Sequence, residues 1–374
     1  MAITAPPAPP AVRAAAAPLR LERLRTLGPN WYACVMGTAI VANGAAALPV
    51  PVPGLRAFGL AVWASSFLLL LVVAAARLAH LVVHRDEARV RLLDDPATAV
   101  FYGCPPMAML AVGHGTLLYG PDVIGTTAAV WTDLVLWTAG TFTSLAVAFG
   151  IPYLMITRHA VRRDGADPTW LLPVVAPMVA AATGPALIPH LPTGEPRELM
   201  VYACYAMFGG SLLATLTVLP GVWSRLVGGR PLAPALAPTL FLVLGPLGQS
   251  TTAVNQLAAA APAATPGHAA AMEAFAVLYG VPVMGFALLW LAIAAAVSLR
   301  ALRGGMPFAM TWWAYTFPTG TCVTGAAALA GRLHLGALTV TAVALYVLLV
   351  TAWAVAATRT LRGVASGSLL PSPA

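Results

Sequence analysis

The chain has 374 residues, of which 60% are hydrophobic and only 9% are charged, and its mean hydropathy is +0.84. This composition excludes a soluble protein with a water-facing surface and indicates a polytopic membrane protein. The formal net charge is +8, and arginine supplies every one of the 20 basic residues. Because a nucleotide-binding loop of the G-x-x-x-x-G-K-[ST] type needs a lysine, we expect no use of ATP.

Ten apolar segments follow one another along the chain, each long enough for the roughly 20 residues of helix that cross a bilayer. Five of them carry no acidic or basic side chain and are interrupted by Gly, Pro, Thr or Ser near their middles; they start near Asn30, Ala97, Trp170, Ala233 and Phe308. The other five alternate with them as plainer runs of Ala, Leu and Val, and start near Leu55, Trp131, Glu198, Ala271 and Leu335.

The interrupted segments recur roughly every 70 residues, which is the length of one helical hairpin with its loops. The sequence therefore predicts an all-α membrane protein with ten transmembrane helices, arranged as five tandem hairpins in a quasi-fivefold bundle around a central pore. The interrupted helices are expected inside and the plain helices outside. Residues 30–359 form this domain, between a disordered N-terminal tail, residues 1–29, and a short C-terminal tail, residues 360–374.

The arginines predict the orientation of the chain. A cytoplasmic N-terminus leaves seventeen arginines inside and only Arg56, Arg197 and Arg332 outside, which is the usual positive-inside bias. Both termini are therefore expected in the cytoplasm, and the protein in the plasma membrane. The same scheme places Asp133 among the charges of the outer side.

Proline inside a helix removes a backbone hydrogen bond at a cost of about 3 kcal/mol or more. In hydrocarbon this is tolerated only where other helices, hydroxyls or water satisfy the freed groups, so repeated breaks favour helices that face a hydrated pathway. Close packing by small residues is the competing interpretation. The residues predicted to line the pathway are Gly37, Thr38, Pro106, His114, Pro177, Thr183, Pro246, Gln249, Thr251, Thr252, Pro318 and Thr319.

The interrupted segments contain no carboxylate that would bind a cation, whereas their hydroxyl and amide groups can solvate an anion. A small anion is therefore the expected cargo. His114 is a candidate proton carrier, with a hydrogen-bonded packing role as the alternative. The four cysteines show no C-x-x-C spacing, and we expect neither a metal site nor another cofactor, and no nucleic-acid partner.

Five motifs resemble the inner-helix signatures of the tellurite-resistance/dicarboxylate transporter family: NWYACVMGTAIV, FYGCPPMAML, LLPVVAPMVAAATGP, LGPLGQSTTA and WWAYTFPTGT. That family includes malate permeases, sulfite exporters, tellurite-resistance proteins and plant slow-type anion channels. The resemblance implies a ten-helix homotrimer with one pore per subunit. It also implies an aromatic gate on the ninth helix, which falls on Phe317, with Tyr315 as the competing register.

The resemblance implies a transporter or channel for small anions, which are C4-dicarboxylates such as malate, or sulfite, tellurite or halides. The alternative is a structural or sensory membrane protein of the same fold that transports nothing. A membrane-embedded enzyme would need a nucleophile with its base or a metal cluster, and the dispersed histidines and cysteines supply neither, so an enzyme is not expected.

Overall fold

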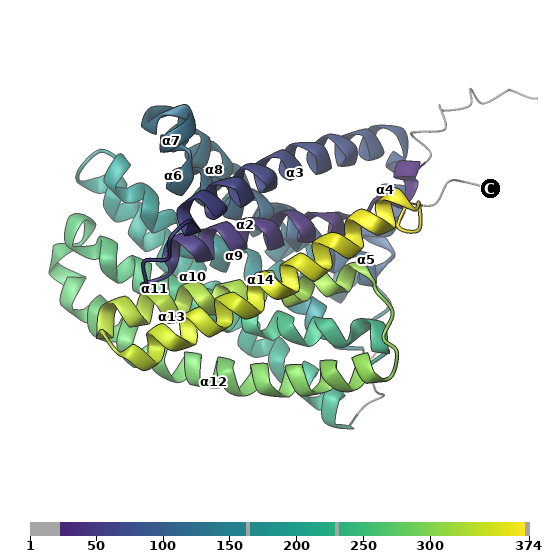
Figure 1. The fold of residues 1–374 in the computed structure, drawn as a ribbon. Helices are drawn as coiled ribbons and strands as arrows, with labels where there is room; N and C mark the ends of the chain where they lie inside the picture. Colours follow the sequence, from purple (N-terminus) through teal and green to yellow (C-terminus); the bar gives the residue numbers. More distant parts are fainter. Residues whose placement is uncertain (1–22, 162–164, 229–231, 371–374) are drawn as a thin grey trace, which may run out of the picture.

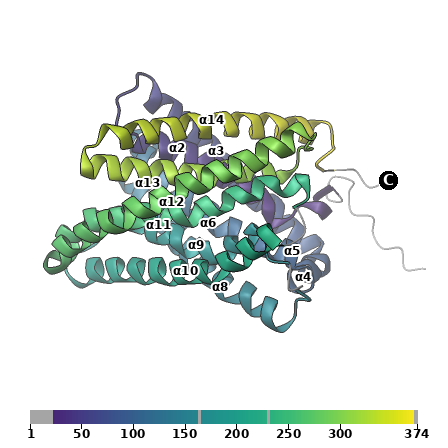
Figure 2. The same ribbon diagram turned by 90° about the horizontal axis from the view of Figure 1, so that it is seen from below.

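The computed structural model describes residues 23–161, 165–228 and 232–370, and these residues form helices and no strand. Figures 1 and 2 show long helices that run side by side. Within the described residues, six helical segments are long and apolar enough to cross a membrane: Leu55–Val83, Thr126–Thr157, Pro168–His190, Glu195–Gly228, Pro266–Arg303 and Gly336–Ala365. The all-helical membrane class is thus confirmed, whereas ten crossings stay a prediction.

Five helices form a closed inner ring. They are α2 (Tyr32–Ala47), α6 (Cys104–Tyr119), α9 (Leu171–Thr183), α11 (Leu244–Ala264) and α13 (Phe317–Leu333). Each contacts the next in chain order, and α13 returns to contact α2.

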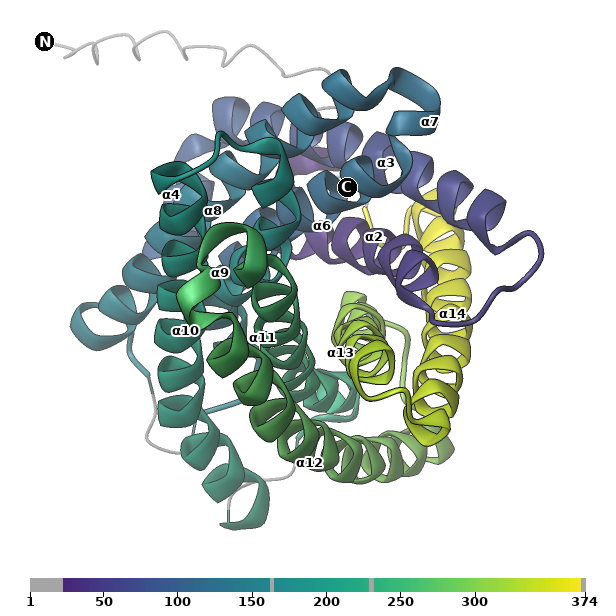
Figure 3. The same ribbon diagram turned by 90° about the vertical axis from the view of Figure 1, so that its left-hand side faces the viewer.

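Five longer helices lie outside this ring, as Figure 3 shows. They are α3 (Leu55–Val83), α8 (Thr126–Thr157), α10 (Glu195–Gly228), α12 (Ala269–Arg303) and α14 (Gly336–Ala365). Each packs on the inner helix that precedes it in the chain and also touches a neighbouring inner helix. In the apolar window of Pro168–His190, which contains α9, 94% of the residues are buried, against 28–33% in the five outer helices. The alternation of interrupted and plain segments therefore marks inner and outer positions.

The inner helices are interrupted at their N-terminal ends, and α9 also passes into a 3-10 helix, η5 (Gly184–His190), at its C-terminal end. A 3-10 helix precedes each inner α-helix, directly in four cases and one residue before α13 in the fifth: η2 (Pro29–Trp31), η3 (Val100–Gly103), η4 (Pro168–Trp170), η6 (Pro234–Val243) and η8 (Met310–Tyr315). Pro106 and Pro318 accordingly stand in the first turn of α6 and α13. Proline is tolerated there because the first N–H groups of a helix have no partner within the helix. Pro177, by contrast, lies inside α9.

Glycine lets two of the inner helices approach each other closely. A Cβ on Gly248 of α11 would lie 2.4 Å from the carbonyl carbon of Thr321 on α13. Because a real side chain cannot occupy that position, the backbones of α11 and α13 meet without an intervening side chain, as small residues allow in membrane helices.

The last residues of the segment predicted as a disordered tail are folded against the end of α3. They form η1 (Arg23–Thr26) and η2, and His80 of α3 donates from Nδ1 to the Leu24 carbonyl over 2.8 Å. The guanidinium of Arg77 donates to the carbonyl of Leu27, whose side chain is buried. Residues 1–22 of that prediction lie outside the described residues. At the other end, α14 continues to Ala365, past the predicted boundary at residue 359.

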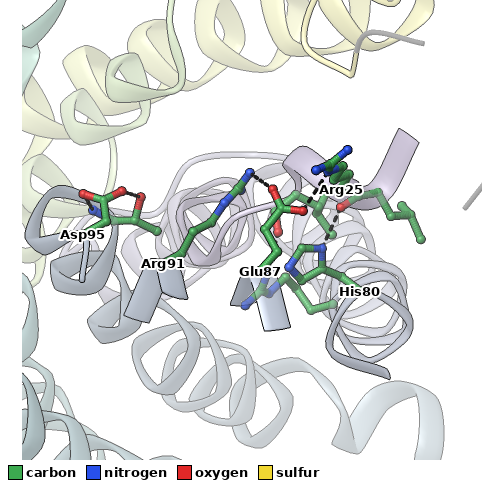
Figure 4. A network of polar contacts seen from close by, with 9 residues as sticks. Arg25, His80, Glu87, Arg91 and Asp95 are labelled. Carbon is green, nitrogen blue, oxygen red and sulfur yellow. Dashed lines mark hydrogen bonds and ion pairs between the residues drawn. The ribbon is translucent and has the colours of Figure 1, made fainter. Parts of the chain in front are cut away.

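An ion-pair network joins this N-terminal segment to α4 (Arg85–Leu93), as Figure 4 shows. Glu87 accepts from Arg25 Nε over 2.8 Å with one carboxylate oxygen and from Arg91 Nη2 over 2.7 Å with the other. Farther along, Asp95 caps α5 (Pro96–Ala99) by accepting from the backbone N–H groups of Ala97 and Thr98. A short helix α7 (Pro121–Ile124) precedes α8.

Candidate transport pathway

A cavity of about 310 Å³ lies between the inner helices, and all five of them line it. We call it the central cavity. Its lining residues are Ile40, Asn43, Ala46 and Ala47 of α2; Ala111, His114 and Leu118 of α6; Val179, Ala182, Thr183 and Ala186 of α9 and η5 (Gly184–His190); Gln249, Thr252 and Gln256 of α11; and Phe317, Thr324, Ala327 and Ala328 of α13.

The lining residues recur at helical spacing. On α11 they are Gln249, Thr252 and Gln256, and on α6 they are Ala111, His114 and Leu118. Positions that are three, four and seven residues apart share one face of an α-helix. Each inner helix therefore presents one narrow stripe to the cavity.

The polar part of the lining is neutral. No Asp, Glu or Arg lines the central cavity in the part of the chain that the structure describes, and His114 is the one titratable lining residue there. The side-chain amide of Gln249 makes no hydrogen bond to another described residue, although the residue is 3% exposed. Its N–H groups are therefore free to meet a solute.

The hydroxyls in the cavity are partly engaged with their own helices. Thr252 and Thr324 share a hydrogen bond of 2.8 Å between their Oγ1 atoms, and Thr252 also donates to the Gly248 carbonyl over 3.0 Å. Asn43 donates from Nδ2 to the Ala111 carbonyl over 3.0 Å, while its Oδ1 is buried with no partner in the described residues. Hydroxyl and amide groups from α2, α11 and α13, together with Thr183 of α9, thus converge on one space.

A second, smaller cavity of about 20 Å³ lies toward the N-terminal ends of the same helices. Its lining is apolar and consists of Met36, Met107, Leu171, Leu172, Val175, Leu242, Gly245, Phe317 and Pro318. In α2, α6 and α9 the lining residues of the central cavity stand later in the helix than those of the small one, so these inner helices run parallel to one another.

Phe317 lines both cavities and is 2% exposed, so its ring lies where the two cavities meet. It is the first residue of α13 and directly follows Thr316, which hydrogen-bonds to the carbonyl of Trp313 over 2.6 Å. The break between η8 and α13 thus places this ring on the axis of the inner ring.

Tyr315, the competing residue, lies elsewhere. Its ring packs edge-to-face on Phe241, with 4.7 Å between centroids, and near Trp312 at 6.0 Å. It lines neither of the two axial cavities. Among the predicted pathway residues, the structure brings together His114, Thr183, Gln249, Thr252, Phe317 and Pro318 at these cavities.

The other predicted pathway residues line neither axial cavity, and several of them contact neighbouring helices. Thr38 accepts a hydrogen bond of 3.1 Å from the indole of Trp353 on α14. Pro177 lines an outer groove with residues of α8 and α10, and a Cβ on Gly37 would collide with Thr316. The residues in this group are Gly37, Thr38, Pro106, Pro177, Pro246, Thr251 and Thr319, none of which lines either axial cavity.

Sequence reasoning did not single out Asn43, Gln256 and Thr324 as lining residues. The helical spacing provides a signal for two of them. Gln256 follows Gln249 by seven residues and therefore shares its face. Thr324 likewise follows the predicted gate residue Phe317 by seven residues on α13 and shares its face.

Asp133 is not at the outer surface, where the sequence scheme placed it. It lies within α8, is 1% exposed, and neither carboxylate oxygen has a hydrogen-bond partner in the described residues. One of these oxygens lies 2.6 Å from the position that a Cβ of Gly113 would occupy. Gly113 of α6 has no side chain and therefore leaves room for the carboxylate. Assigning charges to the inner or outer side of the membrane does not detect packing of this kind.

A ring of parallel helices around a neutral polar cavity, with longer apolar helices outside, defines a multi-pass membrane protein of the channel or transporter class. The sequence model of the family described as voltage-dependent anion channel matches residues 26–361. The chain belongs to this family, whose members are anion transporters and channels, and the predicted family is confirmed.

Curated relatives agree with this assignment. An uncharacterised transporter of Methanocaldococcus jannaschii is 26% identical over 94% of this chain and 97% of its own length. A sulfite efflux pump of Trichophyton rubrum is 28% identical over 79% of this chain and 80% of its own length. A sulfite efflux pump of Arthroderma otae is 27% identical with the same coverage of both chains.

Proposed function

We propose that the protein carries small anions across the plasma membrane along the axis of the inner ring. In this proposal the ten helices α2, α3, α6 and α8 to α14 all cross the bilayer, as five hairpins with quasi-fivefold symmetry. Both termini lie in the cytoplasm, as the arginine distribution favours. A homotrimer with one pathway per subunit follows from the family resemblance.

The observation that carries the proposal is the central cavity, which all five inner helices line. Four of them, α2, α9, α11 and α13, contribute amide or hydroxyl groups, α6 contributes the imidazole of His114, and no carboxylate lines the cavity in the described residues. A cation pathway needs carbonyl or carboxylate oxygens that replace the ion's hydration shell. Hydrogen-bond donors replace the hydration shell of an anion instead. Since the described lining supplies no fixed charge, an anion is bound weakly and leaves readily, as rapid transport requires.

Phe317 is the proposed gate of this pathway. Its ring lies between the polar central cavity and the narrow apolar one. An apolar ring across a narrow passage excludes water and the hydrated ion, and a change of its rotamer removes the barrier. Tyr315 packs against Phe241, away from both cavities, and therefore takes no part in the proposed gate.

Sulfite is the first substrate to test, because two relatives at 27% and 28% identity are named as sulfite efflux pumps. The central cavity, at about 310 Å³, also has room for a C4-dicarboxylate such as malate. Nothing in the lining distinguishes sulfite from malate, tellurite or halides by charge, so all four belong in one panel.

The test is reconstitution into proteoliposomes with sulfite, malate, tellurite, chloride or nitrate gradients. Anion flux and a reversal potential set by the anion gradient are expected. A reversal potential that follows the cation gradient would contradict the proposal. The absence of flux for every anion in the panel would favour the alternative of a structural or sensory protein.

A further inference from the structure

A second polar cavity, of about 610 Å³, opens at the C-terminal ends of α11 and α13. It is called the mouth cavity here. Gln256 and Ala328 line both this cavity and the central one, so the two cavities are adjacent and these side chains lie between them. In the proposed pathway, an ion that leaves the central cavity at this end passes Gln256 and Ala328 and enters the mouth cavity.

Arg332 lines the mouth cavity and is the only arginine that lines either of the two cavities within the described residues. Its side chain is only 16% exposed. Nε donates to Asn255 Oδ1 over 2.9 Å, and Nη2 donates to the Asn255 carbonyl over 3.1 Å. Asn255 therefore holds the guanidinium in one orientation beside the entrance.

The guanidinium keeps unused donors. It has five N–H groups, and in the described residues three of them are occupied: two by Asn255 and one by Glu273, at 3.3 Å from Nη1. The two that remain are on the terminal nitrogens, which is the arrangement that binds the oxygens of a planar or pyramidal oxyanion.

Glu273 is the weak member of this group. Its side chain is 66% exposed, and its contact with Arg332 is the longest of the three. Exposed ion pairs of this kind contribute little, so the carboxylate is a neighbour that an incoming anion can replace.

We propose that Arg332 forms an anion-binding site at the mouth of the pathway, for small oxyanions such as sulfite, and that Glu273 keeps its affinity low by competing for the guanidinium. This inference rests on the proposed function. The site concentrates anions at the entrance, and the neutral amide of Gln256 leads from it toward Gln249, about 10 Å farther along α11. A low affinity leaves the anion free to move on.

The test measures the half-saturating sulfite concentration on each face separately, in membranes that contain the full-length protein. We expect Glu273→Gln to lower the value on the mouth side about two- to fivefold, because it removes an exposed competing charge. Arg332→Gln should raise that value about tenfold, as the loss of a hydrogen bond to a charged group implies. The value on the opposite face should stay the same in both variants.

Asp122→Asn is the matched control. Asp122 is also an exposed carboxylate paired with an arginine, Arg56, and it lines neither cavity. Its replacement should leave the half-saturating concentrations unchanged on both faces.

Suppose that the wild type transports sulfite, but the half-saturating sulfite concentration on the mouth side is unchanged in Glu273→Gln and Arg332→Gln. That result would overturn the mouth site and leave the proposed function intact. No wild-type flux would refute the proposed function itself. Because Arg332 also ties α13 to α11, its variant risks poor folding. Glu273 is exposed, so its variant alone decides the question if Arg332→Gln does not fold.

Discussion

Replacing Phe317 with alanine is the sharpest perturbation of the proposed pathway. The ring separates cavities of about 310 Å³ and about 20 Å³, and its removal joins them. Holding a side chain about 30° off its rotamer costs about 0.5–1.5 kcal/mol, and 1.36 kcal/mol corresponds to a factor of about ten in rate. If that displacement is the barrier, flux in Phe317→Ala rises about twofold to about tenfold. Wetting of the passage adds to this, so the range is a lower limit.

The assay is anion flux per reconstituted protein, with sulfite or chloride as the probe. Phe317→Leu keeps an apolar plug and should stay close to wild type. Tyr315→Ala removes an aromatic ring that lines neither axial cavity and should also leave flux unchanged. A wild-type rate in Phe317→Ala, or a larger increase in Tyr315→Ala, would refute the assignment of the gate.

Three further predictions test other parts of the molecule. Gln249→Leu should reduce anion flux because it removes the free amide of the central cavity. Gln249→Glu should reduce flux further because a carboxylate repels the anion. Equal flux in the two variants would contradict this order. Asp133→Asn should raise the midpoint of thermal unfolding at pH 8. The reason is that burying a neutral amide costs less free energy than burying a carboxylate that has no hydrogen-bond partner in the described residues. A lower midpoint in Asp133→Asn would contradict this prediction. Burial acts to raise the pKa of the Glu87 carboxyl, but the hydrogen bonds and charges of Arg25 and Arg91 together hold that pKa below its ordinary value of 4.5. The stabilisation from Glu87 is therefore present above pH 4.5 and lost as pH falls through the lowered pKa. The protection factor of the Leu27 amide against hydrogen exchange, which corrects for the intrinsic pH dependence of exchange, should fall at that step in wild type. Glu87→Gln should abolish the step.

The sequence predicts which segments are inner and which are outer, because the inner ones lack charge and recur at a regular spacing. It does not predict where the inner helices break. The prolines and glycines suggested breaks in mid-helix, whereas Pro106 and Pro318 occupy first turns that follow 3-10 segments. A composition rule cannot separate these cases, since proline is compatible with a first turn but disruptive farther on.

The lining of the pathway shows the same limit. Thr251 and Thr252 are adjacent and chemically identical, yet only Thr252 lines the central cavity, while Thr251 lies beside Gly280 of α12. Because the inner helices are apolar and buried on nearly every face, amphipathic patterning does not indicate which face meets the cavity.

The sequence by itself determined that the chain is a multi-pass membrane protein of an anion-transporting family. The hydropathy of a segment is a sum over its own residues and does not depend on which helices pack beside it. Each family motif likewise lies within a single segment of the sequence. Only the tertiary structure decided which stripe of each helix meets the cavity, that Asp133 is buried against α6, and that Arg332 meets Asn255. These outcomes depend on the rotation of each helix about its axis. Close packing between distant segments, such as Gly248 against Thr321, fixes that rotation.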